Sequence, residues 1–299
     1  MTGRRFPWFG WVGLAWMAAV QVLLAGDFPL VATWLTPWMW TGYILAADGA
    51  VHALGGKSWF LDRRRELPLL ILASVAIWLV FEAYNFHLRN WTYLGLPEAA
   101  WVRDLGYFWS FATIMPGVFV TATLIESALL RRRPAPPAST ADLTPGEQAL
   151  AFVAGAAMIA LPLAAPPDAA AYLFALVWIG FVPLLDPLNQ RLGGESLWAR
   201  WRAGDRRPAL TLLAGGLVCG FLWELWNLQA LRAGGAYWAY LIPEPLRVFD
   251  LHFGQMPLLG LLGFPPFALE LFAMYQFLRQ ALGGDRVFAP AGSAARRQS

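Results

Sequence analysis

The sequence predicts an all-α fold: a polytopic membrane helical bundle of about eight transmembrane helices, arranged as two parallel four-helix repeats. Composition is the first observation behind this prediction. Of the 299 residues, 58% are hydrophobic and only 14% are charged, and the mean hydropathy is +0.49, whereas roughly 25% of residues are charged in soluble domains. The second observation is a series of apolar runs near 20 residues long, and the third is an internal repeat.

The apolar runs predict the helices one by one. Each run is long enough to cross ~30 Å of hydrocarbon as a helix, which satisfies its own backbone hydrogen bonds in lipid. The first four runs are 9–26, 37–55, 67–88 and 105–130. The last four are 148–165, 170–190, 208–231 and 255–281.

The repeat joins these runs into two units. Residues 10–60 align without a gap on 148–198, and an even number of spans per unit predicts parallel copies related by a pseudo-twofold axis along the membrane normal. Matched positions include Trp40/Trp178, Asp48/Asp186, Glu82/Glu224, Asn85/Asn227 and Trp91/Trp238. The predicted divisions are a first repeat (1–133), a cytoplasmic Pro-rich linker (134–146), a second repeat (147–284) and a flexible cytoplasmic tail (285–299).

The basic residues predict the orientation. Eighteen of the 22 Lys and Arg residues fall at the two ends of the chain and in alternate loops, and the opposite side holds Arg89, Arg103, Arg232 and Arg247. By the positive-inside rule both termini are cytoplasmic, in a multi-pass protein of a bacterial-type inner (plasma) membrane. We expect no nucleic-acid partner, because the basic residues are confined to loops and ends.

Several chemistries are disfavoured. The single cysteine, Cys219, excludes a disulfide within the chain, and no phosphate-binding Gly loop, His-Glu-x-x-His motif or nucleophile elbow is present. Asp48 has His52 on the same helical face but lacks a third ligand, so we predict no metal and no cofactor. Asp48 and Asp186 are instead predicted to order the Arg-rich loops, with Arg63–Arg65 or Arg206–Arg207 as partners.

The Glu-x-x-Asn pairs are the main candidate site. An ionisable side chain in mid-span costs ~2.5–3.5 kcal/mol, and the spacing places Glu82 with Asn85, and Glu224 with Asn227, on one helical face. One interpretation is a structural clasp between helices. The other is a catalytic site in which the twofold axis brings Glu82 and Glu224 together as an acid–base pair, oriented by the two asparagines.

The surroundings supply further candidates. His87 and His252 are predicted proton relays, and Glu270, deep in the last span, is weighed evenly between a functional and a structural role. Aromatic faces beside a proton donor can stabilise the cation that forms when an alkene is protonated. The predicted substrate-binding aromatic residues lie in the same outer half of the protein, or in the outer linkers that alternatively form an interfacial belt: Trp78, Trp91, Tyr93, Trp223, Trp226 and Tyr240.

The order of features in 78–126 is similar to that of the small integral-membrane lycopene cyclase family. An acid follows a Trp-bearing helix, then come the segment Trp91–Pro97 and an aromatic helix with proline, Phe108–Pro116. The resemblance implies a duplicated bundle that cyclises an isoprenoid without redox change, with Glu82 and Glu98 as candidate residues. The paired acids of that family are represented here by Glu98 alone.

The leading hypothesis is therefore an intramembrane, cofactor-independent acid–base enzyme whose partner is a membrane lipid, an isoprenoid or another apolar small molecule. Two alternatives stay open. A proton-coupled transporter or channel would use the same acids, with Glu270 and Asp186 continuing the polar route inward. A scaffold subunit of a membrane complex would use the aromatic faces for docking.

Overall fold

The computed structural model describes residues 4–130, 141–284 and 287. Residues 134–140 of the predicted linker, and the predicted tail apart from residue 287, lie outside the described residues. The helices of the first half are α1 (Trp8–Ala25), α2 (Pro29–Thr33), α3 (Leu35–Ala53), α4 (Leu67–Leu88), α5 (Ala100–Ala112) and α6 (Ile114–Ile125), continued by a π-helical turn, η1 (Glu126–Leu130). Those of the second half are α7 (Pro145–Ala164), α8 (Pro167–Ala170), α9 (Phe174–Arg191), α10 (Leu197–Arg202), α11 (Arg207–Arg232) and α12 (Leu258–Ala281).

Short elements connect the helices. The four strands form two separate antiparallel pairs: β1 (Trp91–Leu94) with β2 (Tyr237–Tyr240), and β3 (His252–Phe253) with β4 (Met256–Pro257). Three 3₁₀ turns complete the described structure: η2 (Ala171–Leu173), η3 (Glu244–Leu246) and η4 (Val248–Asp250). The predicted all-α class is confirmed in the sense that helices make up nearly all of the regular structure.

Seven helical segments in the described part of the chain are long and apolar enough to cross a membrane, and α5 and α6 together form one of them. This finding supports a multi-pass membrane protein. The remaining long helix, α3, has 19 residues but is not among the seven. It carries Thr36, Thr41, Asp48 and His52, which lower its hydropathy, so the count of eight stays a prediction.

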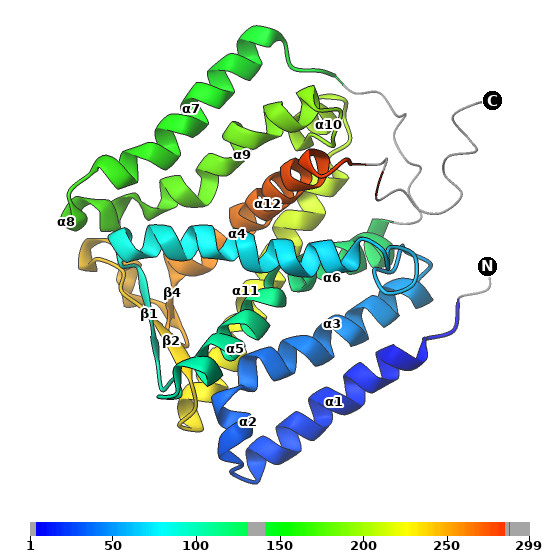
Figure 1. Cartoon of the computed structure of the whole chain (residues 1–299), viewed down its shortest axis with the longest axis vertical. Coiled ribbons are helices and arrows are strands. Elements are labelled where there is room, and N and C mark those ends of the chain that lie inside the picture. The colour runs from blue at the N-terminus through cyan, green and yellow to red at the C-terminus, as the bar shows by residue number, and fades with distance from the viewer. Residues whose placement is uncertain (1–3, 131–140, 285–286, 288–299) are drawn as a thin grey trace.

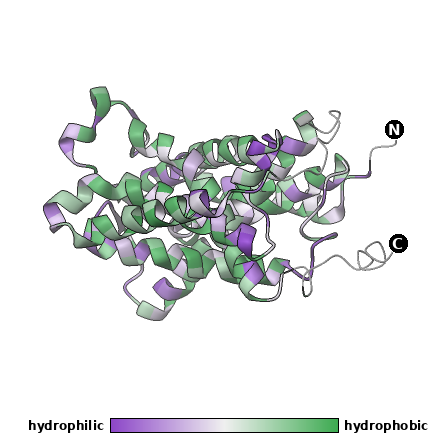
Figure 2. Ribbon diagram, turned by 90° about the horizontal axis from the view of Figure 1, so that it is seen from above, coloured by the Kyte–Doolittle hydropathy of each residue, from purple (hydrophilic) through white to green (hydrophobic). Residues whose placement is uncertain are grey.

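Paired helices lie at the two edges of the bundle. In Figure 1, α1 lies along α3 at one edge and α7 lies along α9 at the other, with α4, α6, α11 and α12 between them. Glycine permits the close approach of α1 to α3, because a Cβ on Gly13 would lie 2.5 Å from the carbonyl oxygen of Gly42. Figure 2 shows that hydrophobic residues continue along these helices.

Asp48 and Asp186 hold the loops that follow α3 and α9. Both side chains are fully buried. Asp48 accepts hydrogen bonds from the Ser58 hydroxyl (2.5 Å) and the Trp59 backbone N–H (2.8 Å). Asp186 accepts equivalent bonds from Ser196 (2.6 Å) and the Leu197 N–H (2.7 Å). The predicted loop-ordering role is confirmed, but the partners are hydroxyl and backbone groups, which satisfy a carboxylate without a paired cation.

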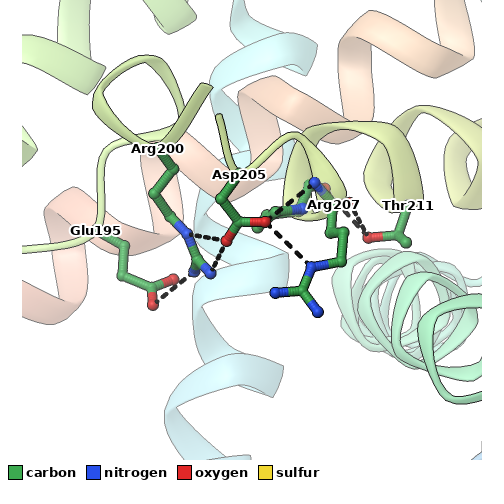
Figure 3. Close-up of polar contacts among 6 residues, drawn as sticks. Glu195, Arg200, Asp205, Arg207 and Thr211 are labelled. Atoms are coloured by element: carbon green, nitrogen blue, oxygen red, sulfur yellow. Dashed lines mark hydrogen bonds and ion pairs between the residues drawn. The ribbon is translucent and has the colours of Figure 1, made fainter. Parts of the chain in front are cut away.

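Among the described residues, Asp48 and Asp186 receive no bond from an arginine, and two of the predicted partners bind other acids: Arg63 binds Glu66 and Arg207 binds Asp205. Asp205 accepts hydrogen bonds from Arg200 (2.5 and 3.1 Å) and from the side chain of Arg207 (3.2 Å), while Glu195 also contacts Arg200 at 3.2 Å (Figure 3). Burial raises the pKa of Asp205, but the hydrogen bonds and charges of the two guanidinium groups outweigh burial and leave the pKa below its usual value.

Glu66 ties the beginning of α4 to the end of α12. Its side chain is 3% exposed, and Oε1 accepts hydrogen bonds from Arg63 (2.7 Å), Tyr275 (2.6 Å) and Arg279 (2.9 Å). Burial raises the pKa of Glu66, but these donors and charges together lower it below the usual value. The network joins the two halves of the chain through a buried, fully paired carboxylate.

Replacement Glu66→Gln is expected to destabilise the protein by about 3 kcal/mol, because it leaves buried positive charge without its counter-ion. Since the folded-state pKa is lowered, this carboxylate contributes stability above its unfolded pKa, and the contribution is lost as pH falls through the folded-state pKa. Unfolding of purified protein in detergent should therefore be less sensitive to acid in the variant. Exposed Glu126→Gln is the control, and equal stability of both variants with wild type would contradict the assignment.

Candidate functional site

The two halves of the chain meet in an antiparallel strand pair. Trp91 pairs with Tyr240, Thr92 with Ala239, and Tyr93 with Trp238. The aromatic outer linkers, predicted either to bind substrate or to form an interfacial belt, are therefore in contact with each other. Thr92 and Ala239 occupy the same position in the predicted repeat, so this register places matched residues opposite one another.

Each strand is held by the asparagine of its own Glu-x-x-Asn pair. Asn85 Nδ2 donates to the Trp91 carbonyl oxygen (2.9 Å), and Asn85 Oδ1 accepts from the Trp91 N–H (3.2 Å). Asn227 makes the same two bonds to the backbone of Trp238, each at 2.9 Å. A side-chain amide carries N–H donors and a carbonyl acceptor in one plane, so it can pair with both the C=O and the N–H of one strand residue. The clasp interpretation thus describes both asparagines, although they clasp strands rather than helices.

Glu82 lies behind an aromatic wall. Its Oε1 accepts hydrogen bonds from Trp78 Nε1 (2.7 Å), Trp91 Nε1 (3.2 Å) and the Tyr93 hydroxyl (2.5 Å). Oε2 has no hydrogen-bond donor among the residues that the structure describes, and the side chain is half-buried. Burial and the adjacent Glu82 raise the pKa of Tyr93 well above its usual value, so its phenol stays protonated.

Glu224 has a different environment, although it matches Glu82 in sequence. It is fully buried, and Oε1 accepts from the Gln255 backbone N–H at 2.5 Å, with the Met256 N–H as a further donor. Oε2 lies 3.4 Å from Asn227 Nδ2. Gly254 has a left-handed φ of +62°, and a Cβ there would overlap the carboxyl group. Glu224 therefore caps the turn between β3 and β4.

The cavity in front of Glu82 has a volume of about 130 Å³. The three donors to Glu82, namely Trp78, Trp91 and Tyr93, all line it. Further aromatic side chains from both halves complete its wall: Trp34, Tyr107, Phe111, Trp178, Trp223, Tyr237, Trp238, Tyr240, Phe264 and Phe267. The site therefore consists of a carboxyl group, Glu82, behind an aromatic cavity surface.

Five of the predicted substrate-binding residues line the cavity: Trp78, Trp91, Tyr93, Trp223 and Tyr240. Trp226 is not among the lining residues and packs edge-on against Trp40, with ring centroids 4.8 Å apart. The other aromatic lining residues were missed: Trp34, Tyr107, Phe111, Trp178, Tyr237, Trp238, Phe264 and Phe267. The match of Trp238 to the predicted residue Trp91 in the repeat was a usable signal for Trp238, but no spacing indicated Phe264 or Phe267.

The other predicted residues lie apart from the cavity lining. His87 Nε2 is 2.9 Å from the Ala165 carbonyl oxygen, and His252 Nδ1 is 2.8 Å from that of Asp250. Glu270 is fully buried and accepts from the Phe181 N–H at 2.9 Å, and its Oε2 has no partner among the described residues. Glu98 is exposed. In the described residues, Glu82 and Glu224 share no hydrogen bond and no common donor.

Within the described part of the chain, no group of three or more His, Cys, Asp or Glu side chains is placed to hold a metal ion. Comparison with protein-family models, with curated proteins and with solved structures gives no match.

Replacement Asn85→Ala is expected to open the strand pair, because it leaves the N–H and C=O of Trp91 unpaired at about 1–3 kcal/mol for each buried group. Amide hydrogen exchange should accelerate in 91–94 and in the partner strand 237–240. Asn227→Ala should give the same pattern. Gln229→Ala, on the same helix as Asn227, is the matched control, since within the described residues that side chain bonds only the Gln21 side chain. Unchanged exchange in both asparagine variants would refute the clasp.

Proposed function

We propose that this protein is an intramembrane acid–base enzyme acting on a lipid or isoprenoid, with Glu82 and Tyr93 as its proton-transfer pair. In this proposal the chain crosses a bacterial inner membrane eight times, α3 included, as two parallel repeats with cytoplasmic termini. The observation that carries the proposal is the convergence of Trp78, Trp91 and Tyr93 on one carboxyl oxygen directly behind an aromatic cavity.

The hydrogen bonds around Glu82 suggest a path for the transferred proton. Trp78, Trp91 and Tyr93 all contact Oε1 of Glu82, and in the acid form of the site the Glu82–Tyr93 bond runs the other way: the carboxyl O–H donates to the phenol oxygen and the phenol O–H points into the cavity. Tyr93 stands between the carboxyl and the cavity, and its phenol passes a proton to a substrate double bond while Glu82 reprotonates the phenol. Because the pKa of Tyr93 is raised, the two transfers are concerted and no phenolate accumulates.

The aromatic wall of the cavity can stabilise the cation that proton transfer to an alkene creates. Protonating an alkene forms a carbocation, and indole and phenyl faces stabilise a cation by about 0.5–2 kcal/mol each. Loss of a neighbouring proton to the Glu82 carboxylate, again through Tyr93, then restores the acid and gives a rearranged or cyclised product. The sequence of steps is redox-neutral, so protons balance without a cofactor.

The environments of Glu224 and Asp186 are consistent with assigning proton transfer to Glu82. Glu224 holds the β3–β4 turn, and we assign it to anchoring rather than to proton transfer. A transport route would need Asp186 to carry protons, but three donors from the loop it caps surround that carboxylate. The structure offers no specific observation in favour of transport or of a scaffold role.

Replacement Glu82→Gln is expected to lower turnover by about 10²- to 10⁴-fold, the usual contribution of general acid–base catalysis, while the protein still folds. Gln keeps an acceptor oxygen for the three donors but carries no exchangeable acid. Mass spectrometry of lipids from membranes that express wild type or variant should show an isomeric product, of unchanged mass, in wild type only. Glu98→Gln is the control with unchanged product, and identical lipid profiles for wild type and Glu82→Gln would end the proposal.

A further inference from the structure

Two hydroxyl groups of α5 face the cavity without a partner. Tyr107 and Ser110 are three residues apart, and both line the cavity. Neither side-chain oxygen makes a hydrogen bond within the described structure, and neither is sealed from solvent. The opposite face of α5 presents Trp101, Leu105 and Phe108 outward. The apolar face of α5 therefore points outward, and its two free hydroxyl groups point toward the cavity.

Free hydroxyls in an apolar wall indicate a polar group on the ligand. An unpaired hydroxyl moved from water to an apolar site costs about 1–3 kcal/mol in proteins. The Thr36 hydroxyl, also on this wall, is buried without a partner among the described residues. Thr33 avoids the cost by donating to the Pro29 carbonyl oxygen of its own helix (2.9 Å). Ser110 makes no such bond, so its hydroxyl is available to a bound molecule.

The wall also restricts the charge of the ligand. None of the described residues that line the cavity is Asp, Glu, Lys, Arg or His. A phosphate, diphosphate or carboxylate placed there would be desolvated without a cation, which costs far more than burying a neutral group. The arginines of the described chain that pair with acids do so elsewhere, as at Asp205 in Figure 3.

The volume of the cavity limits how much of a ligand it can enclose. The cavity, at about 130 Å³, is close in size to an engineered apolar cavity of about 150 Å³ that binds benzene. It therefore encloses one ring or a comparable chain end. The rest of a lipid-sized molecule has to lie outside this space.

We propose that the cavity binds an uncharged ring carrying one hydroxyl or carbonyl oxygen at the end of an apolar chain, with that oxygen hydrogen-bonded to Tyr107 and Ser110. This inference rests on the proposed function, because it names the substrate class of the same site. Glu82 and Tyr93 then act on the ring or on the adjoining chain, while the α5 hydroxyls fix its orientation.

The test compares three probes that differ in one substituent: 4-decylphenol, decylbenzene and 4-decylbenzoate. Affinities for the purified full-length protein are measured by ligand-induced thermal stabilisation in detergent. We expect 4-decylphenol to bind about tenfold more tightly than decylbenzene, as two neutral hydrogen bonds provide, and 4-decylbenzoate to give no stabilisation. The double replacement Tyr107→Phe/Ser110→Ala keeps ring and backbone, and it should abolish the preference for the phenol. Phe108→Leu, on the outer face of α5, should preserve that preference.

Equal affinities of the phenol and decylbenzene for wild type would overturn the inference, and this comparison needs no variant to fold. A preference that survives the double replacement, or benzoate binding as tight as phenol binding, would also overturn it. The proposed function is tested by a different variant. If that function is right, Glu82→Gln removes the isomeric product and leaves binding of 4-decylphenol intact. Product loss without a phenol preference therefore rejects only the present inference.

Discussion

The pairing of β1 with β2 is the interaction on which the site depends. These strands bring Trp91 and Tyr93 from one half of the chain beside Trp238 and Tyr240 from the other, and no single half contains the whole cavity wall. A two-stranded pair is marginal by itself in water. Here Asn85 and Asn227 each satisfy an N–H and a C=O on the outer side of their strand, so backbone groups near the bilayer stay paired.

Matched acids acquire different roles because their neighbours differ. In the second half, the β3–β4 turn with Gly254 approaches α11 closely enough for backbone amides to reach Glu224. Glu82 instead receives only side-chain donors, all of which line the cavity. A carboxyl held by fixed backbone amides is committed to structure. The proposed proton transfer is therefore assigned to the carboxyl that is held by indole and phenol groups.

Much of the fold followed from local patterns, and much of the site did not. Apolar runs predicted the long helices because span length and hydropathy are local properties, and the Glu-x-x-Asn spacing predicted a shared face for the same reason. Counting spans by hydropathy is least reliable for a helix such as α3, whose polar residues lower its mean hydropathy. Pairing of the outer linkers, and the places of Phe264 and Phe267 in the wall, depend on contacts between residues far apart in sequence, for which no spacing carries a signal.

The absence of charge from the cavity lining, as far as the structure describes it, also explains how one weak acid would suffice. In the proposed reaction, a cation formed in the cavity has the newly ionised Glu82 as its counter-ion, and their attraction is strong where the effective dielectric constant is low. That attraction favours return of a proton to Glu82 over escape of the cation, so the product leaves neutral. A fixed Lys or Arg in the wall would oppose the cation, and a second carboxylate would trap it. Glu66, Asp205 and their arginines do not line the cavity, which is compatible with the proposed chemistry.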